Sequence, residues 1–144
     1  MNTTKGSPLA TSGKTTVKIG TQVLLSTLWI VVMINMAYAD ILGLFIPGAL
    51  EEVAKTSVSM GASIPQLMLF GAVMGNLAIA MIILSRVLNY GINRWVNIIV
   101  GIVTIAYIWG GMSSTPHYIF IASVETLTLL LIVWFAWTWR NVET

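Results

Sequence analysis

Four long stretches of the chain are almost entirely apolar, and each has about the length of a membrane-spanning helix. They cover residues 21–46, 65–88, 95–112 and 117–139. A span needs about 20 mostly apolar residues, and the short breaks between these stretches contain proline, glycine or asparagine. The pattern predicts an all-α integral membrane protein whose four helices form one bundle.

Two longer polar segments lie outside these stretches. Residues 1–20 are rich in Ser, Thr and Gly and contain no acidic residue, so we expect a flexible tail ahead of a transmembrane domain at 21–140. In the loop 47–64, Glu51 and Glu52 follow a Pro-Gly pair. Acidic residues favour a helix N-terminus, so this loop is predicted to open with a short surface helix.

The basic residues predict the orientation of the chain. If the N-terminus is cytoplasmic, the outer side carries only Lys55, and the inner side carries the other six: Lys5, Lys14, Lys18, Arg86, Arg94 and Arg140. Cytoplasmic loops are enriched in Lys and Arg, so both termini are predicted to be cytoplasmic. The tryptophans, Trp29 included, lie toward the ends of their spans, and we interpret them as interfacial anchors. The alternative is that three of them form an aromatic box for a ligand: Trp134, Trp137 and Trp139.

The N-terminal stretch also has some features of a cleavable signal peptide. Lysines precede an apolar core that leads to Ala37-Tyr38-Ala39, and small residues at this spacing are typical of a cleavage site. However, the apolar stretch is long for a signal core and continues past the cleavage position. We therefore favour a retained helix over cleavage within residues 1–39.

The composition excludes several classes of function. Of the 144 residues, 57% are hydrophobic and 8% charged, and none is cysteine. A soluble domain carries about a quarter charged residues, so much of this surface is expected to face lipid. No cysteine chemistry is possible, and neither a phosphate loop, a dinucleotide motif nor a zinc-binding helix motif occurs. We expect no cofactor, no metal and no nucleic-acid partner, and nothing in the chain selects an enzyme substrate.

Two carboxylates interrupt the apolar stretches at similar depth in the outer half. They are Asp40 in the first helix and Glu125 in the fourth. An unpaired charge in hydrocarbon costs several kcal/mol, so such residues are often functional. With Tyr107 and Asn76 as hydrogen-bonding groups, they are predicted to form a ligand-binding or proton-handling site.

Other polar residues approach the same layer and are secondary candidates: Asn35, Thr104 and His117. A lone histidine lacks the further ligands that a metal site needs. The alternative for all of these polar groups is that they hydrogen-bond between helices and fix the packing. Gly71 and Gly75, together with the stripe Ala72, Asn76 and Ala80, predict a closely packed seam along the second stretch.

At the cytoplasmic side, Arg86, Arg94 and Trp95 flank a short turn. We favour ordinary membrane anchoring for these residues, and the alternative is that the two arginines bind a lipid phosphate or cap helix ends.

Several segments together resemble a bacterial family of small four-helix membrane proteins of unknown function. The segments are Leu25-Ser26-Thr27-Leu28-Trp29 with Asn35, Asp40-Ile41, Ile46-Pro47-Gly48, Leu84-Ser85-Arg86-Val87-Leu88, Asn93-Arg94-Trp95 with Asn97, and Glu125. The layout is similar to that of the DoxX-like proteins. The resemblance implies a four-helix bundle in a bacterial inner membrane and implies no activity.

The sequence therefore predicts a multi-pass inner-membrane protein with an outward-facing polar pocket. The pocket would bind a small or cationic ligand or move protons. Four helices enclose little volume, so transport would require a homo-oligomer. The alternative is a non-catalytic accessory or scaffold subunit within a larger membrane complex.

Overall fold

The computed structural model describes residues 20–111 and 115–140, and five α-helices make up this part of the chain. They are α1 (Thr21–Leu44), α2 (Ala49–Ser59), α3 (Ile64–Val87), α4 (Tyr90–Gly110) and α5 (Pro116–Thr138). The predicted tail at residues 1–20 lies, apart from Gly20, outside the described residues. Four helices, α1, α3, α4 and α5, are long and apolar enough to cross a membrane. The predicted all-α membrane bundle is thus confirmed.

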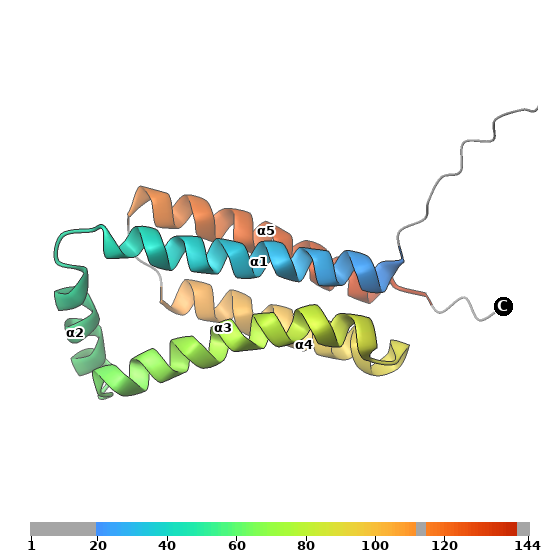
Figure 1. The fold of residues 1–144 in the computed structure, drawn as a ribbon, viewed down its shortest axis with the longest axis horizontal. Helices are drawn as coiled ribbons and strands as arrows, with labels where there is room; N and C mark the ends of the chain where they lie inside the picture. The colour runs from blue at the N-terminus through green and yellow to red at the C-terminus, as the bar shows by residue number, and fades with distance from the viewer. Residues whose placement is uncertain (1–19, 112–114, 141–144) are drawn as a thin grey trace, which may run out of the picture.

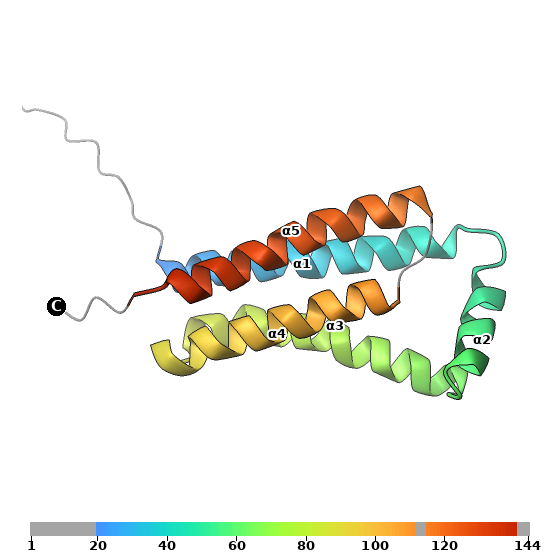
Figure 2. The ribbon, with the colours of Figure 1, turned by 180° about the vertical axis from the view of Figure 1, so that it is seen from behind.

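Each of the four long helices runs antiparallel to the next long helix in the chain (Figures 1 and 2). α1 packs against both α3 and α5, and α4 packs against α5. The start of α1, the α3–α4 link and the end of α5 lie at one end of the bundle, which we call the terminal end. At the opposite end, the far end, α2 runs crosswise from α1 to α3 (Figure 1).

The short helix predicted in the loop 47–64 is present as α2. Its N-cap Gly48 has a φ of 82°, a left-handed conformation that glycine adopts without a steric penalty. Glu51 and Glu52 occupy its first turn, where carboxylates stabilise the helix dipole. α3 then begins with a capping box, in which Ser63 and Gln66 bond to each other's backbone N–H groups. Local sequence therefore determines where the crosswise helix ends and the next span begins.

The predicted start of the third span at residue 95 is wrong, because α4 begins five residues earlier, at Tyr90. Most of the supposed polar link is the first turn of this helix. The Asn93 side chain explains the difference, since its Nδ2 donates to the Ser85 and Leu88 carbonyls at the end of α3. A polar residue that reads as a loop signal therefore lies inside a helix and caps its neighbour.

The protein interior is made of apolar side chains at the crossing of the helices, and Trp29, Leu25 and Met81 are fully buried. α4 and α5 pack closely at Gly101, where an added Cβ would lie 3.0 Å from Val133 Cγ2. The helices also present many exposed large apolar side chains. Such a surface is expected of a bundle that lipid surrounds.

Candidate functional site

Glu125 is a buried acidic side chain in the middle of a candidate membrane span. The residue is 3% exposed, and its Oε1 atom makes no hydrogen bond with any described residue. Buried polar atoms are nearly always hydrogen-bonded, and a carboxylate oxygen is among the most costly to leave without a partner. Apart from Arg94 Nε, this oxygen is the one buried side-chain nitrogen or oxygen among the described residues that lacks a hydrogen-bond partner.

Three other ionisable side chains lie within electrostatic range of Glu125. The charge of Asp40 acts on Glu125, and the charges of both carboxylates act on Tyr107 and Tyr118. These groups come from three helices: α1, α4 and α5. We call Glu125, Asp40, Tyr107 and Tyr118 the acidic cluster.

Asp40 differs from Glu125 in its surroundings. It lies near the end of α1 and is exposed, while Glu125 is covered by neighbouring helices. Two carboxylates that interact electrostatically disfavour simultaneous ionisation, so a proton or a cation stabilises the pair. The pair thus combines an acid on the surface of the bundle with an acid in its interior.

The two tyrosines are fixed by contacts with the ends of α3 and α4. The Tyr107 ring packs edge-on against Phe70, with ring centroids 5.6 Å apart. Its hydroxyl lies 3.5 Å from the position of a Cβ added to Gly71, so an alanine at this position would make an ordinary van der Waals contact with Tyr107. The Tyr118 hydroxyl donates to the Ile108 carbonyl at 3.1 Å, which leaves its oxygen free to accept another bond.

Asn76 and Thr104, which the sequence placed near this layer, bond to their own helices. The Asn76 side chain is exposed on α3, and its Nδ2 donates to the Ala72 carbonyl at 2.9 Å. Thr104 is buried on α4 and donates to the Val100 carbonyl. Gly75 has nothing within 4 Å of an added Cβ, so the seam predicted around Asn76 is not a packed seam within one chain.

Asn35 and His117 both line a groove between α1 and α5. This groove has a volume of about 210 Å³, and Tyr38 is the other polar residue in its wall. The remaining lining residues are apolar. Two of the secondary candidates are therefore brought together, although the groove does not include Glu125.

A second group of buried polar residues lies toward the terminal end, and here the hydrogen bonds are complete. The Asn97 Oδ1 accepts from Trp29 Nε1 at 2.7 Å and from Ser85 Oγ at 3.1 Å. The Asn97 Nδ2 donates to both the backbone and side-chain oxygens of Asn93. This asparagine network joins α1, α3 and α4, and a satisfied network of this kind rigidifies a bundle.

The prediction that Trp29 is an interfacial anchor is wrong, because the side chain is fully buried and donates into the asparagine network. Arg86 also has an internal contact, since its Nε donates to Ser26 Oγ on α1 at 2.9 Å. Trp95, in contrast, is 55% exposed near the start of α4, where an anchor would lie.

Sequence analysis missed Asn93, Asn97 and Tyr118 as functional or structural groups. The buried positions of α4 recur at spacings of three and four, as Asn93, Asn97, Gly101, Thr104 and Ile108. That stripe becomes visible only if the helix starts before residue 95. Tyr118 precedes Glu125 by seven residues, two helical turns on the same face, and this spacing was the available signal.

Within the part of the chain that the structure describes, no group of three or more His, Cys, Asp or Glu residues is placed to hold a metal ion. The acidic cluster contains two carboxylates, each of which can accept hydrogen bonds or a positive charge.

The four apolar helices and the buried polar groups between them define a small all-α membrane protein. Residues 17–144 match the model of a protein family, described as the family of unknown function DUF6326, and the chain belongs to that family. Comparisons with curated proteins and with solved structures gave no match.

Proposed function

We propose that this membrane protein binds a small cation at Glu125 in exchange for a proton. The observation that carries the proposal is the buried Oε1 of Glu125, which lacks a hydrogen-bond partner among the described residues. A buried carboxyl in a membrane must be protonated, paired or hydrated. A cation and a proton therefore compete for the same oxygen.

Asp40, Tyr107 and Tyr118 have defined roles in this proposal. Asp40 is exposed and receives the cation or proton first. The hydroxyl oxygens of Tyr107 and Tyr118 supply neutral ligands, which stabilise a cation without adding a charge. Neither Asn76 nor Thr104 is needed, because each bonds to its own helix.

The site is proposed to open to the outside of a bacterial inner membrane. Three described arginines lie at the terminal end, and Lys55 lies on α2 at the far end with Glu51 and Glu52. Under the positive-inside rule the terminal end is cytoplasmic, which places Asp40 in the outer half. The DoxX-like layout remains a prediction.

Proton release measures the proposed exchange directly. Adding Na⁺ or tetramethylammonium to weakly buffered, purified protein should release protons, since neither ion carries an exchangeable proton. Glu125→Gln should abolish this release, and Asp40→Asn should reduce it. Glu51→Gln, on the exposed face of α2, is the matched control and should release as much as the wild type. Equal release from Glu125→Gln would contradict the proposal.

A scaffold or accessory role is the second candidate function. The face of α3 that carries Gly75 and Asn76 favours this role because no other helix that the structure describes packs against it. Gly75 is open, and Asn76 is exposed with its carbonyl oxygen free of any hydrogen bond among the described residues. Small residues and amides promote helix association in membranes, including homo-oligomers. Gly75→Leu should then dissociate an oligomer or a larger complex in mild detergent, whereas Glu125→Gln should leave it intact. A chain that sediments as a monomer, with no partner retained, would exclude this role.

A further inference from the structure

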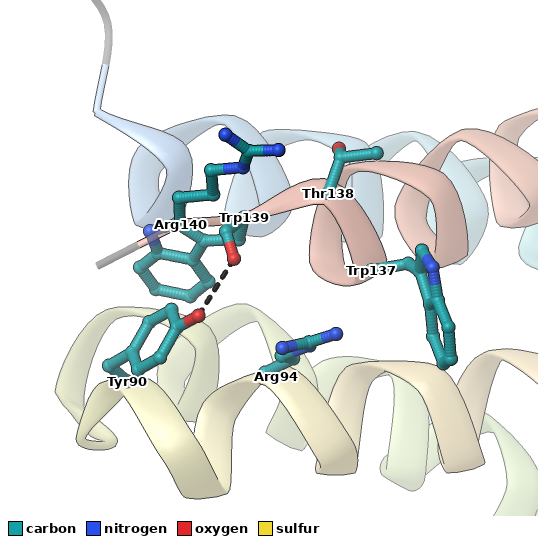
Figure 3. Close-up of a pocket in the computed structure, with 6 residues that line it drawn as sticks. All are labelled: Tyr90, Arg94, Trp137, Thr138, Trp139 and Arg140. Carbon is teal, nitrogen blue, oxygen red and sulfur yellow. Dashed lines mark hydrogen bonds between the residues drawn. The ribbon is translucent and has the colours of Figure 1, made fainter. Parts of the chain in front are cut away.

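The terminal end contains a pocket with a volume of about 340 Å³ between the start of α4 and the end of α5. Six residues line it: Tyr90, Arg94, Trp137, Thr138, Trp139 and Arg140. Figure 3 shows Arg94 directed along α4 toward Trp137, with Arg140 on the other side of the end of α5. The lining thus combines two guanidinium groups with three aromatic rings.

Arg94 is one of the two cations of this pocket and forms no ion pair with a described residue. The Arg94 Nε is buried and makes no hydrogen bond with any described residue. The Arg94 Cζ lies over the Trp137 ring, 5.3 Å from the ring centroid. This cation–π contact adds no anion, so the N–H groups of the guanidinium can still donate to a charged acceptor.

Among the residues that the structure describes, no acidic side chain lines the pocket. The carboxylates that the structure describes lie in α1, α2 and the middle of α5: Asp40, Glu51, Glu52 and Glu125. Arg94 is partly exposed, but its buried Nε makes no hydrogen bond with a described residue, so an anion from outside the described chain would stabilise the guanidinium.

The walls of the pocket are already fixed by other contacts. The Tyr90 hydroxyl donates to the Trp139 carbonyl at 2.7 Å, and the two rings pack edge to face with centroids 5.1 Å apart. The Thr138 hydroxyl donates its proton to the Trp134 carbonyl, so it can act toward a ligand only as an acceptor. The donors available to a ligand are therefore the guanidinium groups of Arg94 and Arg140 and the indole N–H groups of Trp137 and Trp139, and only the two guanidinium groups carry a positive charge.

The position of the pocket suits a lipid. Arg94 lies in the second turn of α4, and Arg140 follows the last residue of α5, so both lie where the spans leave the hydrocarbon. Trp137 is 57% exposed, as is typical of the aromatic belts at headgroup depth. Arg140 is exposed, and its long side chain reaches a headgroup by changing rotamer.

We infer that this pocket binds the phosphate group of an anionic lipid, with Arg94 as the principal ligand and Arg140 as the second. Arginine suits a phosphate because its planar N–H edge donates two parallel hydrogen bonds. The site lies at the opposite end of the bundle from Asp40 and is independent of the cation exchange proposed above.

Lipid retention tests the inference. Purified protein is exchanged into detergent with phosphatidylglycerol or phosphatidylcholine, and bound lipid is measured by native mass spectrometry. Wild type should retain phosphatidylglycerol, and Arg94→Gln should lower its affinity about tenfold, the effect of losing charge-assisted bonds. Arg140→Gln, beyond the last helical residue, should lower it less while leaving the fold unchanged. Arg94→Lys keeps the charge and should retain the lipid better than Arg94→Gln.

Arg86→Gln is the matched control, because it removes a charge at the same end but outside the pocket. If Arg94→Gln and Arg86→Gln lower retention equally, the inference is overturned. A second arm adds inorganic phosphate without lipid. If inorganic phosphate alone raises the free energy of unfolding of the wild type but not of Arg94→Gln, the site binds the free ion. If only phosphatidylglycerol raises it, the site binds the lipid. Absence of binding in both arms overturns the phosphate site.

Discussion

At the scale of single residues, the two polar groups of the bundle differ in one property. The hydrogen bonds of Asn93 and Asn97 are complete, whereas a buried oxygen of Glu125 lacks a partner among the described residues. A complete network contributes stability and specificity, and an incomplete one is available for a ligand. This difference is why we assign structure to the asparagines and binding to the glutamate.

Replacing Asn97 tests the structural role. Asn97→Leu removes the acceptor of Trp29 and Ser85 and the donor to Asn93, so it should lower the free energy of unfolding by about 1–3 kcal/mol. Denaturation in mixed micelles measures the change. Asn76→Leu is the control, since the exposed amide bonds only within α3, and it should change the stability of the monomer little. Equal stabilities of Asn97→Leu and wild type would refute the role.

The residue scale is also where sequence reasoning reached its limit. Asp40 and Glu125 stand out in apolar segments, so both were predicted as candidates without coordinates. Burial separates them, and it depends on how α1 and α5 face their neighbours, which periodicity does not specify when a helix is apolar all round. Asn97 was not predicted to be an internal hub because its partners Trp29 and Ser85 lie on other helices.

At the scale of elements, length and hydropathy determined the spans well. Four apolar stretches predicted four helices, and only the start of α4 differed substantially. The membrane explains this success, because a backbone in hydrocarbon must satisfy its hydrogen bonds within its own helix. Helix pairing was less predictable, since small residues occur both where helices meet, as at Gly101, and where they do not, as at Gly75.

These two glycines provide a prediction about helix packing. Gly101→Leu places a side chain against Val133 on α5, because the Cβ alone would lie 3.0 Å from Val133 Cγ2. We expect a loss of about 1–3 kcal/mol in unfolding free energy. Gly75→Leu should cost the monomer far less, and unfolding of both variants in the same micelles gives the comparison. Gly101→Ala adds only the Cβ and should destabilise the bundle less than Gly101→Leu. Combining it with Val133→Ala should restore part of the lost stability. If no stability is restored, the Gly101–Val133 contact is contradicted.

At the scale of the whole molecule, the bundle has two chemically different ends. The terminal end carries Arg86, Arg94 and Arg140, and the far end carries α2 with both adjacent glutamates. Our account places the arginine end in the cytoplasm and the acidic cluster toward the outside. Both proposals depend on this asymmetry, because it sets which leaflet supplies the lipid and which side supplies the cation.

The orientation is testable because the sequence contains no cysteine, so single-cysteine variants have no background. Ser59→Cys on α2 and Asn89→Cys in the α3–α4 link are both exposed positions at opposite ends. With an impermeant maleimide, Ser59→Cys should react in intact spheroplasts, and Asn89→Cys only after the membrane is opened. The reverse labelling pattern would invert the orientation.

The central claim is that the carboxyl of Glu125 takes up a proton that a cation displaces. Infrared difference spectroscopy of the protein in lipid nanodiscs observes this group directly. A protonated-carboxyl band should be present in the wild type and in Glu51→Gln, should weaken when Na⁺ or tetramethylammonium is added at constant pH, and should be missing from Glu125→Gln. Identical spectra for the wild type and Glu125→Gln throughout the titration would contradict the claim.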